Sequence, residues 1–190
     1  VQPGAPAVQN LESNDWRFSS NTVLRNGEMY AVQTIDDLSA LGRATVRFLR
    51  IDALNNNLQE SVVLNQTSLA LTFPSIAVNE FGDVVIGATG TSSTEFASGN
   101  ALVRRAGSGV FEPLQLRAGV ANYVNLDSLN RNRWGDYSAT TVDPADPSIF
   151  WTTQEFISSA NVWSTQMTEL ILPRSAEARC SLLRHCQRKY

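Results

Sequence analysis

Cysteine, histidine and lysine are almost missing from this sequence. The 190 residues include two Cys, one His and one Lys, and all four lie between Arg174 and Tyr190. The preceding residues therefore have no disulfide framework and no thiolate metal site. They also lack the histidine of a Ser–His–Asp or Cys–His catalytic centre. The spacing of Cys180, His185 and Cys186 matches no zinc pattern.

Positive charge is also scarce outside this C-terminal segment. Residues 174–190 hold five of the 15 basic residues and one of the 18 acidic residues, so the remainder holds 10 basic and 17 acidic groups. An acidic body argues against a nucleic-acid partner, which requires a clustered basic face. The alien composition of residues 173–190 predicts a basic tail outside the fold.

Long apolar runs are absent as well. No run approaches the roughly 20 residues that a membrane-spanning helix needs, so we expect no membrane span. The chain starts at Val1 rather than Met, which suggests a processed or truncated start.

The sequence does contain an internal repeat. Three segments of 16 residues align without gaps: Ser19–Thr34, Pro74–Thr89 and Ser138–Thr153. Each has a short apolar strand, a turn of Asn, Gly, Asp or Pro, and a second apolar strand, which is typical of a β-hairpin. The second strands are near-continuous apolar runs, so we expect them to be buried on both faces; they contain Tyr30-Ala31-Val32, Val84-Val85-Ile86 and Ile149-Phe150-Trp151.

Further strands follow each hairpin. The pattern predicts third strands at 45–51, 100–105 and 162–172, and fourth strands at 58–64 and 110–116. Four antiparallel strands per repeat, at a period of roughly 40 to 65 residues, are typical of a β-propeller blade. We therefore predict an all-β fold, a partial β-propeller with a lead-in at 1–18 and three blades, the third incomplete, at 19–64, 74–116 and 133–172. A sandwich of about eleven strands is the alternative.

Propellers close with typically 4–8 blades. Three blades would leave strand edges unpaired at both ends of the arc, and open edges invite association. We therefore expect self-association through open strand edges.

The densest cluster of chemically capable groups lies where the longest connection enters the third repeat. Loops that lead into the innermost strands line one mouth of a propeller channel, where ligand sites gather. Arginine binds carboxylates and phosphates through its planar fork, whereas carboxylates and tyrosine supply acid, base or nucleophile. The candidate ligand-binding residues are Arg131, Arg133 and Trp134, and the candidate catalytic residues are Asp136, Tyr137 and Glu155.

A structural interpretation of the same segment is also open. In it, Trp134 packs between blades, Arg133 pairs with Asp136, and Gly135 permits a tight bend. Asp143 and Asp146 offer oxygen ligands for Ca²⁺, but their spacing is not that of an EF-hand, and Asp and Pro are ordinary turn formers. We expect no metal and no cofactor.

Two segments, Phe73–Gly90 and Arg133–Phe156, resemble secreted bacterial proteins of the sialidase-like (exo-alpha-sialidase/BNR-type) β-propeller class. The resemblance implies a six-bladed, carbohydrate-active propeller. It also implies an arginine on a substrate carboxylate, a Tyr–Glu nucleophile pair and an Asp acid/base, which match Arg133, Tyr137, Glu155 and Asp136. The Asp-box of that class is absent. Arg104 and Arg105 cannot complete an arginine triad, because neighbouring residues of a strand point to opposite faces.

These observations predict a ligand-binding or adhesion module of a larger secreted bacterial protein, with carbohydrate or protein as partner. The alternative is a glycoside hydrolase of sialidase-like type, with part of its site in this chain. A purely structural repeat is a third possibility.

Overall fold

The computed structural model describes residues 2–4, 10–13, 16–37, 42–65 and 68–174, which form three antiparallel sheets. Sheet 1 has the strand order β1-β2-β3-β4: Val23–Arg25, Glu28–Asp36, Ala44–Asp52 and Asn57–Leu64. Sheet 2 has the order β5-β6-β7-β8: Ala70–Val78, Val84–Thr91, Ser98–Arg104 and Glu112–Arg117. Sheet 3 has the order β9-β10-β11: Ala139–Val142, Ile149–Ser159 and Val162–Ile171.

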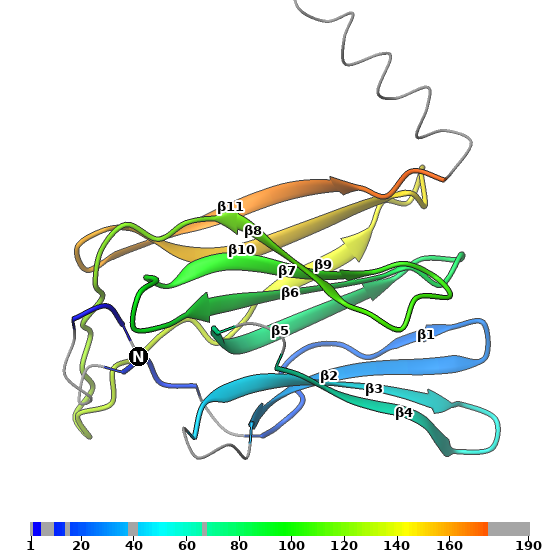
Figure 1. Cartoon of the computed structure of the whole chain (residues 1–190), viewed down its shortest axis with the longest axis horizontal. Helices are drawn as coiled ribbons and strands as arrows, with labels where there is room; N and C mark the ends of the chain where they lie inside the picture. Colours follow the sequence, from blue (N-terminus) through cyan, green and yellow to red (C-terminus); the bar gives the residue numbers. More distant parts are fainter. Residues whose placement is uncertain (1, 5–9, 14–15, 38–41, 66–67, 175–190) are drawn as a thin grey trace, which may run out of the picture.

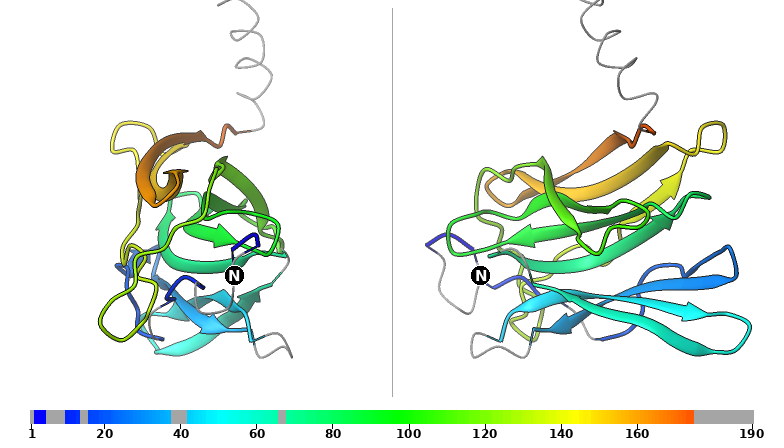
Figure 2. Two further views of the ribbon diagram at one scale, coloured as in Figure 1. Left: turned by 90° about the vertical axis from the view of Figure 1, so that its left-hand side faces the viewer. Right: turned by 45° about the vertical axis from the view of Figure 1, so that its right-hand side comes forward.

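The three sheets are stacked face to face, with sheet 2 in the middle (Figures 1 and 2). Each sheet is a meander in which strands that follow one another in sequence lie side by side, and no sheet closes on itself. The all-β prediction is confirmed. Three layers also differ from the two layers of the sandwich alternative. Across the described ranges there is no helix long and apolar enough to cross a membrane.

Aromatic residues fill the interface between sheets 1 and 2. Phe48 of β3 is fully buried and meets Phe111 edge-on, with ring centroids 5.3 Å apart. The guanidinium of Arg104 from β7 lies over both rings and donates a 2.6 Å hydrogen bond to Glu60 of β4. A buried charge is tolerated here because it is both paired and stacked.

Small apolar residues and a polar network fill the interface between sheets 2 and 3. Ala77, Val85 and Ala101 of sheet 2 pack with Phe150 and Leu170 of sheet 3. The approach is close, because a Cβ on Gly87 of β6 would overlap side chains of β10.

Hydroxyl and amide groups of β5, β9 and β10 connect the same two sheets. Ser75 of β5 lies 2.7 Å from Thr140 of β9, oxygen to oxygen, and Thr140 lies 2.9 Å from Thr152 of β10. Gln154 donates to Thr152 at 2.8 Å. Hydrogen bonds between buried polar groups help fix the register of one sheet on the next, although the Oε1 atom of Gln154 is buried without a hydrogen-bond partner.

The strands agree with the repeat pattern in type and order, and their bounds differ by a few residues. The expectation of burial on both faces is confirmed for Tyr30-Ala31-Val32 and Val84-Val85-Ile86. It is wrong for Ile149-Phe150-Trp151, where only Phe150 is buried, because the outer face of sheet 3 has no further sheet on it. Arg104 and Arg105 do point to opposite faces: Arg104 faces sheet 1, whereas Arg105 donates to the backbone oxygens of Leu172 and Pro173 beyond sheet 3.

Residues near both chain ends contact the body. The Gln2 side chain is buried and exchanges two hydrogen bonds of 2.8 Å with the backbone of Tyr123. Leu11 forms a parallel bridge with Asn132, so the lead-in lies against the long loop of residues 118–134. Arg174 stacks its guanidinium over Phe81. The predicted basic tail lies outside the described residues from residue 175 onward.

Candidate functional site

Residues 133–138 run from the long loop into β9 at one end of the sheet stack. Trp134 is only 4% exposed. Its ring meets Tyr123 edge-on at 5.2 Å between centroids, packs in a cluster with Phe73 and Ile157, and donates a hydrogen bond of 3.2 Å to Thr89 Oγ1. Trp134 therefore joins the long loop to sheets 2 and 3 and is not available to a ligand.

The two candidate arginines form ion pairs within the same segment. Arg133 donates to both carboxylate oxygens of Asp136 at 3.1 and 3.2 Å, and both side chains are 33% exposed. Arg131 pairs with Asp127 at 2.8 Å, four residues earlier in the loop. An ion pair this exposed contributes about 0.2–1 kcal/mol, so the Arg133–Asp136 pair shapes the loop more than it stabilises the fold.

Glu155 of β10 lies beneath the backbone of Gly135. A Cβ on Gly135 would overlap the Glu155 carboxylate, so only glycine permits this contact. Burial raises the pKa of Glu155, and the negative charge of Asp136 raises that pKa further, against the opposing hydrogen bond from the Gly135 backbone N–H. Two carboxylates close enough to interact therefore have different environments, since Asp136 is paired with Arg133.

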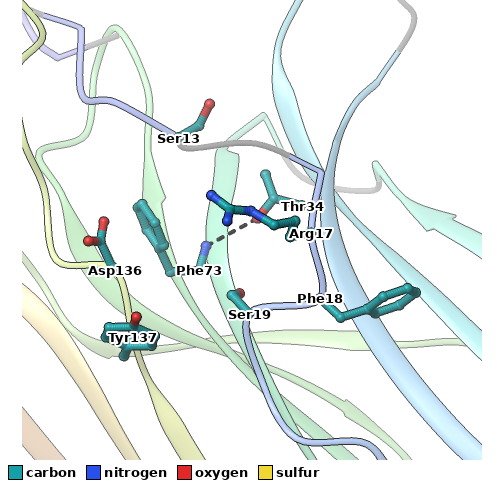
Figure 3. Close-up of a pocket in the computed structure, with 8 residues that line it drawn as sticks. All are labelled: Ser13, Arg17, Phe18, Ser19, Thr34, Phe73, Asp136 and Tyr137. Carbon is teal, nitrogen blue, oxygen red and sulfur yellow. Dashed lines mark hydrogen bonds between the residues drawn. The ribbon is translucent and has the colours of Figure 1, made fainter.

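A pocket of about 230 Å³ lies beside this segment (Figure 3). Of the candidate residues, it brings together Asp136 and Tyr137, while Arg131, Arg133, Trp134 and Glu155 do not line it. Tyr137 is 76% exposed. The other lining residues are Ser13, Arg17, Phe18, Ser19, Thr34 and Phe73.

The pocket gathers equivalent positions of the three repeats. Phe18, Phe73 and Tyr137 each stand immediately before one 16-residue repeat, and all three line the pocket. The ring of Phe18 turns away from Tyr137 and Asp136 (Figure 3). An aromatic residue directly before each repeat is therefore the signal in the sequence for the side of the pocket that the lead-in forms.

Phe73 lines the pocket and has an unusual backbone conformation. Its φ is 51°, in the left-handed region that aromatic residues rarely adopt, and the pairing of β5 with β6 is irregular between Thr72 and Ser75. The Phe73 N–H donates to Thr34 Oγ1 at 3.3 Å, and its carbonyl accepts a 2.7 Å hydrogen bond from Ser138. These contacts join all three sheets at the pocket.

A second cavity of about 360 Å³ lies along β5 and the start of β9, and it shares Ser19 and Tyr137 with the first. It is rich in hydroxyl and amide groups, because Ser20, Asn21, Ser75, Ser138 and Thr140 line it. Together the two cavities offer short polar groups that both donate and accept hydrogen bonds, beside one exposed aromatic ring. Such a surface suits a ligand with many hydroxyl groups and some apolar C–H surface.

The Asp143–Asp146 turn uses its carboxylates internally. Asp143 accepts hydrogen bonds from Trp151 Nε1 and from the backbone N–H groups of Ala145 and Asp146, and these bonds lower its pKa. Asp146 accepts from Ser148. Within the described ranges, no group of three or more His, Cys, Asp or Glu side chains is placed to hold a metal ion.

Comparison with known proteins does not add to this site. No protein-family model matches the chain, and no curated protein sequence matches it.

Proposed function

We propose that the chain is a carbohydrate-binding module whose ligand site is the pocket at Asp136 and Tyr137. In this proposal the three sheets are consecutive blades of a β-propeller, and the pocket lies at one mouth of its channel. The meander order of each sheet, the face-to-face stacking and the threefold repeat support this arrangement. The sialidase-like resemblance supports a larger secreted bacterial protein as the source of this module.

The observation that carries the proposal is the exposed ring of Tyr137 beside a cavity lined by hydroxyl groups. A sugar presents hydroxyls that hydrogen-bond to serine and threonine, and a C–H face that packs on an aromatic ring. Tyrosine suits both contacts, since it combines an apolar ring with a polar end. The pocket lining also carries charge, because Arg17 lines it together with Asp136, and Asp136 is paired with Arg133.

The proposal is tested by screening the full chain on a glycan array and measuring the best ligand by isothermal titration calorimetry. Tyr137→Ala should weaken binding at least tenfold, about 1.4 kcal/mol, whereas Tyr137→Phe should keep most of the affinity. Leu129→Ala is the matched control, because Leu129 is exposed on the same loop and lines neither cavity. Absence of glycan binding by the folded chain, or equal affinity in Tyr137→Ala, would refute the proposal.

A glycoside hydrolase of sialidase-like type is the second candidate, favoured by the raised pKa of Glu155 beside Asp136. Pairs of carboxylates whose environments separate their pKa values are typical acid and base partners. The test is release of a chromophore from aryl glycosides, with Glu155→Gln and Asp136→Asn as variants. Turnover that both variants abolish would support hydrolysis. Glycan binding without turnover would support the binding module.

A further inference from the structure

Both ends of the sheet stack present exposed apolar side chains on a face that no further sheet of the described residues covers. Residues of one strand alternate between faces, and on β11 the odd-numbered positions point outward while Leu170 is buried against sheet 2. The outward apolar residues are each more than half exposed: Trp163, Met167 and Ile171. We call this the sheet 3 end face.

Sheet 1 has a corresponding outer surface. Leu24 pairs with Met29, and Leu58 pairs with Ile51, on the side opposite the buried Tyr30 and Phe48. Leu24 and Leu58 are more than half exposed, and Val63 is also exposed on this side. We call this the sheet 1 end face.

The repeat shows how such faces pack. Tyr30, Val85 and Ile149 are equivalent positions of the three repeats. Tyr30 packs in the core between sheets 1 and 2, and Val85 in the core between sheets 2 and 3. Ile149, paired with Ile171, lies on the sheet 3 end face. This end face is therefore the equivalent of two faces that are buried against a following sheet.

The opposite faces follow the same rule. Ile86 of sheet 2 packs toward sheet 1, and Phe150 of sheet 3 packs toward sheet 2. Their equivalent in sheet 1 is Ala31, which lies on the sheet 1 end face and is itself buried there beside its strand partner Leu49. The exposed apolar residues of this face belong to its edge strands, Leu24 of β1 and Leu58 and Val63 of β4. At both internal interfaces, the face that carries the Tyr30 position of one repeat packs on the face that carries the Phe150 position of the next repeat. The two end faces of the stack are thus the two halves of one more such interface.

Charge supports the same pairing. Arg47 lies on the sheet 1 end face beside its strand partner Val63, and its Nε is buried without a hydrogen-bond partner. Glu169 is exposed on the sheet 3 end face between Met167 and Ile171. Within the chain, Arg104 and Glu60 make the equivalent kind of contact across sheets 1 and 2. The buried Nε is out of reach of a second copy, so Glu169 acts on Arg47 through its charge, and opposite charges favour this pairing over a contact between two like faces.

We propose that a second copy of this chain covers these faces head to tail, with the sheet 3 end face of each copy on the sheet 1 end face of the other. Two copies of three sheets give six sheets, which is within the range at which stacked blades close into a ring. A head-to-tail contact that closes limits the assembly to a defined size. The contact uses sheet faces rather than strand edges. It rests on the blade arrangement proposed above, but not on carbohydrate binding, so loss of glycan binding leaves it standing.

The first test is sedimentation equilibrium of the full chain over a range of concentrations, where a dimer is expected. Met167→Glu and Leu58→Glu each place a charge on one end face and should each shift the protein to monomer. Leu129→Glu is the control, since Leu129 is exposed in the long loop away from both faces. Circular dichroism melts check that each variant is folded. Mixing Met167→Glu with Leu58→Glu should give heterodimers held by a single contact, because one contact is then unaltered while the other contains both introduced glutamates; they should be weaker than the wild-type dimer but present where each variant alone is monomeric.

The second test is charge exchange. Arg47→Glu and Glu169→Arg should each weaken the dimer, and the double variant should recover it, because both charges are then reversed in every contact. A wild-type monomer at all concentrations overturns the proposal. A dimer that Leu58→Glu leaves intact also overturns the proposal, because it indicates a symmetric contact through sheet 3. An assembly that keeps growing with concentration overturns it as well, because the contact then does not close.

Discussion

At the scale of single residues, the segment Arg133–Tyr137 divides into two parts with different roles. Trp134 packs as the structural interpretation of the sequence predicted, whereas Asp136 and Tyr137 line the pocket and their catalytic roles stay a prediction. The sequence could identify the cluster but not these directions. The segment is irregular and precedes β9, so no strand alternation relates one side chain to the next.

Trp134→Ala should lower the free energy of unfolding by about 3–5 kcal/mol, the usual cost of removing a large buried aromatic side chain. Trp134→Phe keeps an aromatic ring but loses the hydrogen bond to Thr89, and should cost clearly less. Urea unfolding measures both. Trp16→Ala is the control, because Trp16 is exposed. A loss below about 1 kcal/mol for Trp134→Ala would contradict its place in the core.

Glu155→Gln should stabilise the protein at neutral pH and have little effect at acidic pH. The pKa of Glu155 is raised in the folded state, so the folded protein binds its proton more tightly than the unfolded chain does. That contribution is fully present below the ordinary glutamate pKa and is lost as pH rises through the raised value. Glutamine has the same shape, can still accept from Gly135, and carries no charge.

Thermal melts at acidic and neutral pH measure this effect. Asp136→Asn removes the charge that raises the Glu155 pKa, so the benefit of Glu155→Gln should be smaller in that background. Glu112→Gln, at an exposed position of β8, is the control. A lower melting temperature for Glu155→Gln at neutral pH would count against the raised pKa.

At the scale of elements, the repeat predicted the strands and their order well. Short apolar runs between Asn, Gly, Asp and Pro turns are a local signal, and local signals are visible in one sequence. The repeat could not show that Phe73 adopts a left-handed conformation or that the pairing of β5 with β6 is irregular there. That conformation depends on Thr34 and Ser138, which come from other sheets.

Gly87→Ala should lower the free energy of unfolding by about 1–3 kcal/mol, the usual cost of overpacking a filled interior. The new Cβ would overlap the side chains of Thr152 and Gln154, and sheets 2 and 3 would have to separate. Gly109→Ala is a matched control, because a Cβ there meets open space and its φ is not positive. Chemical denaturation of both variants decides, and equal stability would show that the two sheets tolerate a wider spacing.

At the scale of the whole molecule, three sheets meet at one pocket through segments far apart in the sequence. The sequence predicted that the entry to the third repeat lies near the inner strands. It did not predict that Ser13, Arg17 and Ser19 come to the same place. Ser13 and Arg17 stand before the first repeat and Ser19 is its first residue, and only the stacking of sheet 1 on sheet 2 brings them there.

The lead-in also takes part in the fold, which leads to a last prediction. The Gln2 side chain satisfies both backbone groups of Tyr123, on the loop that holds Trp134. Gln2→Ala leaves the Tyr123 N–H without that partner, whereas the Tyr123 carbonyl keeps the hydrogen bond from Asn132, and the change should cost about 1–3 kcal/mol of unfolding free energy. Gln59→Ala, at an exposed position of β4, is the matched control.

Hydrogen exchange gives a second readout of the same change. If Gln2 anchors the long loop, exchange should become faster at Tyr123 and Trp134 in Gln2→Ala, and stay unchanged in the distant β3–β4 turn. Loss of the Gln2 contact would then also disturb the pocket, because Asp136 and Tyr137, which line it, follow Trp134 by two and three residues. Unchanged stability and unchanged exchange would show instead that the long loop holds its position without Gln2.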